Sequence, residues 1–414
     1  MNVELASPST QTDIAIIGAG SQALTLVAHL LQKRSSLNNK FVTIDPSGKW
    51  MSRWQQQFAA LKIPHLRSPA VHHPDPNPYA LRRFAEGRSD ELFPPYDLPG
   101  TQLFDDFCRD VVHRWQLEDR VLKAAVTRIQ PITDWGRCRF QLELETGQLL
   151  KARRVVLATG SGKLQLPDWA HQISSAYPQE RLRHSQQVDL RELHLQGERI
   201  LIVGGGLTSG HLAVGAIALG AKVQIMVRRQ LQERLFDADP GWLGPKYLKA
   251  FRAEADWEQR SSLIQQARNG GSMTPAIMTQ LRRYSRSGQL RFDEQCEIVK
   301  AEWQDSCWRV SCTDGSEHEC DRIWLATGTR FDATTEPLLK EVQEAFPTEM
   351  INGLPVLDEH LRWSGCELFV MGGLAALQLG PVARNLSGAR MAGDRIVPAL
   401  TKSSLALLPV RNVS

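Results

Sequence analysis

The chain has 414 residues, of which 42% are hydrophobic and 23% are charged, and its formal net charge is +4. A chain of this length usually forms two or three domains. The small charge and the scattered arginines disfavour a nucleic-acid-binding protein, and no apolar run reaches the roughly 18–20 residues that a membrane helix needs. The N-terminus lacks a basic stretch followed by an apolar one, so we expect no signal peptide and a cytoplasmic location.

The cysteines argue against a disulfide scaffold. Their number is odd, and none has the C-x-x-C spacing of a zinc ribbon or a redox dithiol. Buried thiols such as Cys307 and Cys312 are therefore interpreted as small hydrophobic side chains, and no metal site is expected. The seven cysteines are Cys108, Cys138, Cys296, Cys307, Cys312, Cys320 and Cys366.

The chain opens with a predicted β-α-β unit. Residues 13–17 are an apolar run ending in glycine, which is typical of a buried parallel strand. Residues 21–34 place their leucines on one face of a helix, and residues 41–45 form a second strand. The following segment, 46–107, is rich in Pro, Trp and His and is predicted to be mainly loop with short helices.

The second half repeats this order of elements. In the first half, an antiparallel hairpin beginning near Val126 leads into the apolar strand 155–160, which ends in Ala-Thr-Gly. The repeat consists of a strand (200–203), a glycine-rich turn, a helix (207–219), a strand (223–227), a hairpin around Asp314-Gly315 and a second strand ending in Ala-Thr-Gly (323–328). A last apolar strand, 368–373, precedes a helix in which Ala383, Leu386 and Met391 have helical spacing.

Each β-α-β unit contains a glycine-rich fingerprint between its strand and its helix. The first glycine permits a tight turn, the second lets the backbone approach a pyrophosphate, and the third small residue lets the helix pack on the strand. The helix N-terminal amides then bind phosphate. The residues expected at the two sites are Gly18, Gly20, Ser21, Gln22 and Ala23 in the first copy, and Gly204, Gly206, Thr208 and Ser209 in the second.

The residues at the end of each second strand distinguish the two ligands. Asp45 can accept hydrogen bonds from both ribose hydroxyls and would repel a 2′-phosphate, which suits FAD or NAD. Arg228 and Arg229 offer charge-assisted hydrogen bonds to a 2′-phosphate, which indicates NADPH. The alternative is that one arginine is merely solvated. Together the two sites imply a flavoprotein that accepts hydride from NADPH.

Other residues are expected close to the cofactors. Thr159-Gly160 and Thr327-Gly328 end strands where the chain crosses between domains, and Gly372, Gly373 and Gly380 are expected to bring backbone close to the flavin ring. Trp54 could form a wall of the flavin site, although tryptophan also packs in cores.

The fold class predicted is α/β, with two Rossmann-like dinucleotide-binding domains. Residues 1–165 form the first part of the FAD-binding domain, and residues 331–414 supply its second part with a C-terminal tail. Residues 166–330 form the NADPH-binding domain, with a helical insertion at about 235–290.

The stretch 184–229, with an H-S pair before its strand and R-R after the next, resembles the NADPH-binding segment of class B flavin-dependent monooxygenases. The run DRIWLATGT at 321–329 is similar to the D-x-x-x-L-A-T-G-Y signature of that superfamily, with Thr329 in place of tyrosine. Of a further element of the superfamily, only His184 is present.

Segments 50–85, 239–251 and 269–283 resemble the branch that N-hydroxylates lysine or ornithine for siderophores. Where that branch carries a Met-Gln pair near the flavin, this chain has HLRSP at 65–69. From this loop we expect Arg67 and His65 to line the isoalloxazine as catalytic residues, although histidines there could be ordinary loop residues. Asn269 and Lys246 are expected to meet substrate or nicotinamide ribose.

The resemblance implies that NADPH reduces FAD, that dioxygen adds to the flavin as a C4a-hydroperoxide, and that a small-molecule amine takes one oxygen atom. Two alternatives stay open: an NADPH-dependent flavin oxidoreductase that inserts no oxygen, and a non-enzymatic flavin-binding regulator. A homo-oligomer also stays open.

Overall fold

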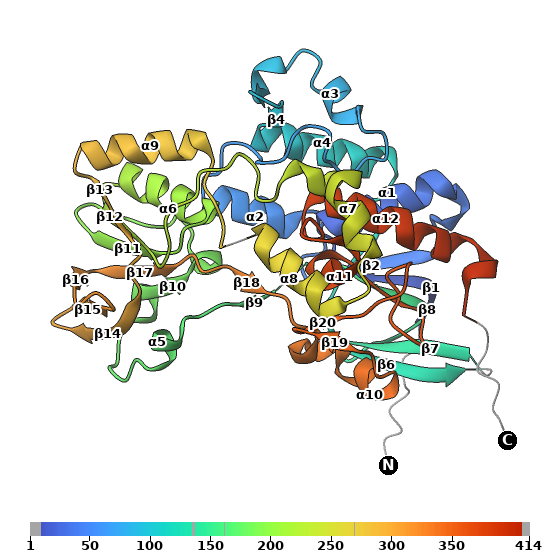
Figure 1. Ribbon diagram of the computed structural model, residues 1–414. Helices are drawn as coiled ribbons and strands as arrows, with labels where there is room; N and C mark the ends of the chain where they lie inside the picture. The colour runs from blue at the N-terminus through green and yellow to red at the C-terminus, as the bar shows by residue number, and fades with distance from the viewer. Residues whose placement is uncertain (1–9, 135–136, 161, 269, 408–414) are drawn as a thin grey trace.

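Two sheet-centred units lie side by side in the computed structural model, which describes residues 10–134, 137–160, 162–268 and 270–407 (Figure 1). Each unit contains the predicted strand, glycine turn, helix and strand. The prediction of an α/β protein with two Rossmann-like units is therefore confirmed. Among the helices of the described ranges, none is long and apolar enough to cross a membrane.

The first unit is built on a seven-stranded sheet with the order β5-β2-β1-β8-β7-β6, in which β21 also pairs with β8. β8 runs parallel to β1 at Ile17↔Leu157 and antiparallel to β7 at Phe140↔Ala152, so the predicted hairpin and the Ala-Thr-Gly strand share one long strand. The strands are β1 (Thr10–Ile17), β2 (Phe41–Asp45), β5 (Val121–Lys123), β6 (Val126–Asp134), β7 (Arg137–Leu144), β8 (Leu149–Leu157) and β21 (Leu368–Val370).

The helices of this unit bury the sheet. Helix α1 is buried at every residue from Gln22 to Leu31, because α12 packs along it while the sheet covers its other side. The helices are α1 (Ser21–Lys33), α2 (Ser52–Ala60), α3 (Ala80–Phe84), α4 (Thr101–Arg114), α10 (Lys340–Ala345), α11 (Ala376–Leu379) and α12 (Leu386–Thr401). Two short hairpins, β3 (Leu92–Phe93) with β4 (Leu98–Pro99) and β19 (Met350–Ile351) with β20 (Leu354–Pro355), complete it.

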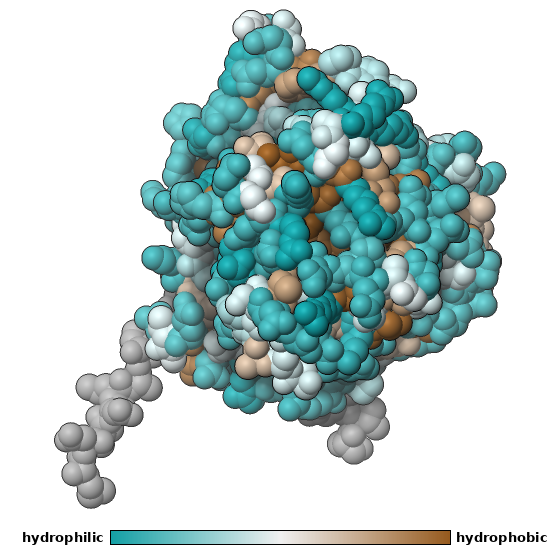
Figure 2. Space-filling view, turned by 90° about the vertical axis from the view of Figure 1, so that its left-hand side faces the viewer, coloured by the Kyte–Doolittle hydropathy of each residue, from teal (hydrophilic) through white to brown (hydrophobic). Residues whose placement is uncertain are grey.

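The second unit has a five-stranded parallel sheet with the order β10-β17-β11-β12-β13. A three-stranded antiparallel sheet, β14-β15-β16, packs against it through a shared core. The elements are β10 (Leu182–His184), β11 (Arg199–Val203), β12 (Lys222–Val227), β13 (Leu290–Glu294), β14 (Ile298–Gln304), β15 (Cys307–Cys312), β16 (Glu317–Cys320), β17 (Arg322–Leu325), α5 (Asp168–His171) and α6 (Leu207–Ala218). The face of this unit seen in Figure 2 is largely hydrophilic, and hydrophobic residues gather mainly in its recesses.

The insertion is helical, as predicted, but its helices divide between the two units. It contains α7 (Pro245–Ala253), α8 (Trp257–Arg268) and α9 (Pro275–Arg286). Trp242, Phe251 and Ile264 join the hydrophobic core of the first unit, whereas α9 packs on α6 of the second. By packing, α7 and α8 therefore belong to the first unit (Figure 1).

A two-stranded ribbon joins the units. Strands β9 (Lys163–Leu164) and β18 (Thr329–Arg330) pair antiparallel. β9 begins shortly after the first Ala-Thr-Gly sequence, and β18 begins directly after the second. Residues 165 and 330, which end the first and second predicted segments, lie at this ribbon.

Candidate functional site

The first glycine of each fingerprint lies against the carbonyl of the alanine that directly follows the neighbouring strand. A Cβ at Gly18 would lie 2.7 Å from the Ala158 oxygen, and a Cβ at Gly204 would lie 2.5 Å from the Ala326 oxygen. Both glycines also have positive φ, 101° and 135°. Both the positive φ and the lack of space for a Cβ therefore require glycine at each turn. The residues that it packs against are the alanines of the two Ala-Thr-Gly sequences.

The second glycines leave the helix ends open. Gly20 and Gly206 are the N-caps of α1 and α6, and neither helix end has a side-chain cap. A Cβ at either glycine would meet nothing within 4 Å. The free N–H groups and the helix dipole make both ends suitable for a dinucleotide pyrophosphate, so the cradles fit the group that the fingerprints predict.

The third small residues pack and do not face the crevice. Ala23 and Ser209 are completely buried, and the Ser209 hydroxyl has no hydrogen-bond partner among the described residues. Gln22 is also buried, and its Nε2 donates to the carbonyls of Ala383 (3.4 Å) and Asn385 (3.2 Å). Gln22 therefore ties the loop before α12 to the first fingerprint. Ser21 and Thr208, at the two helix starts, are half-buried.

Asp45 lies at the carboxyl end of β2, beside the first fingerprint. Its Oδ2 accepts the Ala19 N–H at 3.0 Å, and its Oδ1 accepts the N–H and hydroxyl of Ser47 at 2.9 and 2.6 Å. These bonds hold the carboxylate in place, and a carboxylate with about four acceptor sites retains capacity for ribose hydroxyls.

Arg228 and Arg229 are exposed and follow β12 directly. A Cβ at Gly270 would lie 3.6 Å from Nη1 of Arg229, so this arginine reaches the loop before α9. The same loop covers the second fingerprint, because a Cβ at Gly271 would lie 3.1 Å from Cα of Gly206. The basic pair, the open helix end and the insertion loop thus surround one site.

The ends of the Ala-Thr-Gly strands meet the ribbon. The Thr327 hydroxyl donates to the Gln165 carbonyl, and the Gly328 oxygen accepts from the Gln165 N–H at 3.1 Å. His184 Nε2 also lies 3.1 Å from the Gly328 oxygen, and burial lowers its pKa. A neutral imidazole with hydrogen on Nε2 satisfies this contact, so His184 acts here as a structural tie.

Gly160 and Gly372 lie side by side in the first unit, where a Cβ at Gly372 would be 4.0 Å from Cα of Gly160. Thr159 precedes this pair and is half-buried. Gly373 instead packs against Phe331, whose ring a Cβ would meet at 2.4 Å.

The predicted last helix begins later than its apolar spacing suggested. Gly380, with φ 80°, ends α11, and Asn385 is the N-cap of α12, so Ala383 lies in the loop between them. A Cβ at Gly380 would lie 3.5 Å from the Trp242 ring, which means that the insertion covers this turn.

Arg67 joins the flavin-proximal loop to the insertion. Its guanidinium donates to the carbonyls of Leu235 (2.7 Å), Arg234 (2.7 Å) and Ser272 (3.2 Å) and to the Ser272 hydroxyl (2.8 Å). Each guanidinium nitrogen thus has a protein acceptor. Catalysis by Arg67 stays a prediction, and the contacts seen give it a positioning role.

His65 and Trp54 occupy the same segment. His65 stacks on Phe93 at 4.9 Å. Burial, with a smaller electrostatic contribution from nearby His65, lowers the pKa of His211 on α6 to about 4. Trp54 packs on Phe58 and Phe104 at 4.3 and 5.2 Å. Contact of either residue with a cofactor stays a prediction.

A charged cluster that we did not predict lies between the insertion and the loop before α12. Asp237 accepts from Arg268 at 2.6 Å and from Asn385 at 3.2 Å. Arg384 is solvent-accessible, yet surrounding protein and Arg268 lower its pKa to about 10. No fingerprint includes these residues, and only their convergence in space marks them.

Of the two insertion residues expected to meet substrate, Asn269 lies outside the described residues. The Lys246 ammonium lies 4.8 Å from the Tyr247 ring. Its contact with substrate stays a prediction.

Fold and site together define an oxidoreductase-type protein with two dinucleotide sites. The family model for pyridine nucleotide-disulphide oxidoreductases matches residues 12–393. The chain belongs to this family. No curated protein matches the sequence significantly.

Solved structures share the architecture over most of the chain. Ornithine hydroxylase PvdA from Pseudomonas aeruginosa has a TM-score of 0.75 at 17% identity, covering 94% of this chain and 99% of that chain. DfoA, the cadaverine monooxygenase from Erwinia amylovora, solved with FAD, has a TM-score of 0.76 at 15% identity, with 95% of each chain covered. The bacillithiol disulfide reductase from Bacillus cereus scores lower, 0.61 at 16% identity, covering 94% of this chain and 99% of that chain. The class B-like fold expected from the resemblance is thereby confirmed.

Proposed function

We propose that this protein is an FAD- and NADPH-dependent monooxygenase that N-hydroxylates a small primary amine such as lysine or ornithine. The observation that carries the proposal is the pair of uncapped helix ends in one chain, one beside an acidic residue and one beside two arginines. The flavin, when bound, supplies the hydride acceptor and the means of activating dioxygen.

The chain's own residues would bind and orient these groups. The α1 N-terminus and Asp45 would hold the FAD pyrophosphate and ribose, and the α6 N-terminus with Arg228 and Arg229 would hold NADPH. The insertion loop at 270–273 and its anchor Arg67 would close the second site against water.

Two observations favour oxygen insertion over disulfide reduction. The sequence has no C-x-x-C pair, so a redox dithiol of that spacing is absent from the chain. The amine hydroxylases also resemble the fold more closely than the bacillithiol disulfide reductase does, with TM-scores of 0.75 and 0.76 against 0.61.

The test is a two-stage reaction. Flavin-loaded protein is first reduced with NADPH without oxygen, and oxygen is then admitted with L-lysine, L-ornithine or cadaverine. We expect bleaching of the flavin followed by an amine product one oxygen atom heavier in mass spectrometry. Formation of hydrogen peroxide alone with every amine would contradict N-hydroxylation and favour an oxidoreductase without oxygen insertion. Failure of NADPH to reduce the flavin would reject both and favour a regulator.

A further inference from the structure

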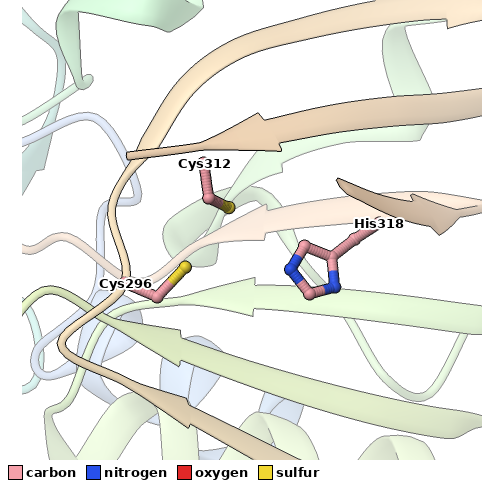
Figure 3. Close-up of side chains that lie close together, drawn as sticks. All are labelled: Cys296, Cys312 and His318. Carbon is pink, nitrogen blue, oxygen red and sulfur yellow. The ribbon is translucent and has the colours of Figure 1, made fainter. Parts of the chain in front are cut away.

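Three buried side chains with metal-ligating atoms lie close together in the second unit. Cys296 lies in the turn between β13 and β14, Cys312 ends β15, and His318 lies on β16 (Figure 3). Their ligand atoms all lie within 4.8 Å of one another, and the three residues are only 4%, 5% and 9% exposed. The sequence separations of 16 and 6 residues match no zinc motif, which is why we did not predict them.

The donor set is soft and the geometry is close to that of a metal centre. Zn²⁺ binds thiolate sulfur at about 2.3 Å and imidazole nitrogen at about 2.0 Å, so ligand atoms around it lie nearly 4 Å apart. The atoms here would need to move by no more than about 1 Å to reach that spacing. A further soft atom, Sδ of Met226, lies 3.6 Å from Sγ of Cys312.

The imidazole of His318 is fixed in orientation by two polar neighbours. Figure 3 shows the His318 ring with one nitrogen directed toward the two thiols. Nδ1 lies 2.9 Å from Nε2 of Gln224, and Nε2 lies 3.0 Å from the Ser316 hydroxyl. Both ring nitrogens thus have a polar partner, so an ion bound by one nitrogen would displace that partner, while the partner of the other nitrogen would still orient the ring.

We propose that Cys296, Cys312 and His318 bind one Zn²⁺ ion. Two thiolates and a neutral imidazole around Zn²⁺ give a complex without net charge, which removes the main cost of burying an ion. Binding replaces the two thiol protons, so two protons leave for each ion bound. A monovalent soft ion would leave one negative charge in the same buried place.

The site is connected to the strand that carries the predicted NADPH arginines. The Cys296 N–H donates to the Val227 carbonyl at 3.1 Å, and Met226 lies on β12, two residues before Arg228. An ion at this point would join the β14-β15-β16 sheet to the end of β12. Its role would be to hold that end in place, independently of the catalytic reaction proposed above.

The experiment uses the full chain with flavin bound. Its thiols are first reduced, and metal is then removed with a chelator. Zn²⁺ is titrated against a chromophoric chelator, and Co²⁺ replaces it as a spectroscopic probe. We expect one equivalent of Zn²⁺ per chain, release of two protons, a thiolate-to-cobalt charge-transfer band, and a higher thermal unfolding temperature with Zn²⁺.

Variants assign the ion to the three residues. Cys296→Ser, Cys312→Ser and His318→Gln should each weaken Zn²⁺ binding by at least about tenfold. Cys320→Ser is the matched control, because Cys320 is a buried thiol of the same core that lies outside the cluster. It should bind Zn²⁺ as the wild type does, even if it is less stable.

Several results would overturn the proposal. The wild type could bind less than one equivalent, or Cys312→Ser and His318→Gln could bind with unchanged affinity, which would place the ion elsewhere. Binding of Cu⁺ but not Zn²⁺ would overturn the assignment to zinc. Because the assay reads metal directly, it is independent of whether the protein hydroxylates amines.

Discussion

Gly271 rests on Gly206, so that a Cβ at Gly271 would come within 3.1 Å of the Gly206 Cα. The insertion loop therefore lies over the end of α6 where the NADPH pyrophosphate is expected. Two side-chain contacts of Arg67, with the carbonyl and the hydroxyl of Ser272, hold the loop there. A residue of the first unit thus contacts the loop that lies over the fingerprint of the second.

Replacement of Arg67 by alanine should therefore act mainly on nucleotide binding. Hydrogen bonds from a charged donor contribute about 1.5–3 kcal/mol each, so their loss should free the loop. We expect the KM for NADPH to change severalfold, with kcat for flavin reduction at saturating NADPH little changed. A fall in kcat alone would instead support the catalytic role predicted for Arg67 from the sequence. Stopped-flow reduction separates the two.

The arginine pair should decide between the two nicotinamide cofactors. Replacing Arg228 and Arg229 with alanine should raise the KM for NADPH by about tenfold or more, since each charge-assisted bond to phosphate is worth about 1.5–3 kcal/mol. The KM for NADH should stay nearly unchanged. Arg283→Ala, at an exposed position on α9, is the control. An equal loss for both cofactors would refute recognition of the 2′-phosphate.

The two glycines of the second fingerprint should respond differently to substitution. Gly204→Ala combines positive φ with a Cβ 2.5 Å from the Ala326 oxygen, so we expect a loss of at least about 2 kcal/mol in unfolding free energy. Gly206→Ala meets no neighbouring atom and should fold normally while binding NADPH more weakly. Chemical denaturation and NADPH titration measure the two effects. Equal stability of both variants would contradict the packing seen here.

His211 should make the protein sensitive to acid. Burial lowers its pKa from 6.5 to about 4, so the unfolded chain binds more protons than the folded chain between these pH values. Stability should therefore rise with pH across this window and fall on acidification, by about 3 kcal/mol for this imidazole.

His211→Gln should flatten that dependence in urea unfolding measured from pH 7 to 4. His113→Gln is the control, since the His113 side chain is largely exposed. If both variants showed the wild-type slope, His211 would not be the source of the effect.

Arg384 should contribute to retention of the flavin. It lies between Ala383 and Asn385, whose carbonyls bind Gln22 at the start of α1. Its guanidinium also carries positive charge near Asp237, which is already paired with Arg268. Arg384→Ala should lower FAD affinity severalfold in equilibrium dialysis, whereas Arg384→Lys should recover much of it. Unchanged FAD binding would contradict a role of Arg384 in holding the flavin.

The sequence predicted the parts of the fold that depend on local patterns. The β-α-β units, the hairpins and the two glycine turns follow from apolar spacing and from glycine's backbone freedom. The insertion was also recognised as helical. The division of its helices between two cores was not predicted, because the apolar spacing of a helix does not show which unit the helix packs against.

The same distinction applies to the site. Asp45, Arg228 and Arg229 were predicted to bind the cofactors because they stand at the end of the second strand of each β-α-β unit, which is a local feature of the sequence. The contact of Asp237 with Asn385 and that of Arg67 with Leu235 join residues that are 148 and 168 positions apart. Such contacts leave no periodic trace in one sequence. The start of α12 was missed for a related reason, since Gly380 turns the chain before Ala383.

The paired strands β9 and β18 have a mechanical consequence when combined with the path of the insertion. The ribbon alone would act as a torsion hinge between the two halves. The insertion, however, packs into the core of the first unit through Trp242, Phe251 and Ile264. It therefore provides a second connection between the two halves, away from the ribbon. Rotation about the ribbon would have to extract these side chains. We therefore expect cofactors to exchange through movement of loops and ligands, while the two units keep their relative orientation.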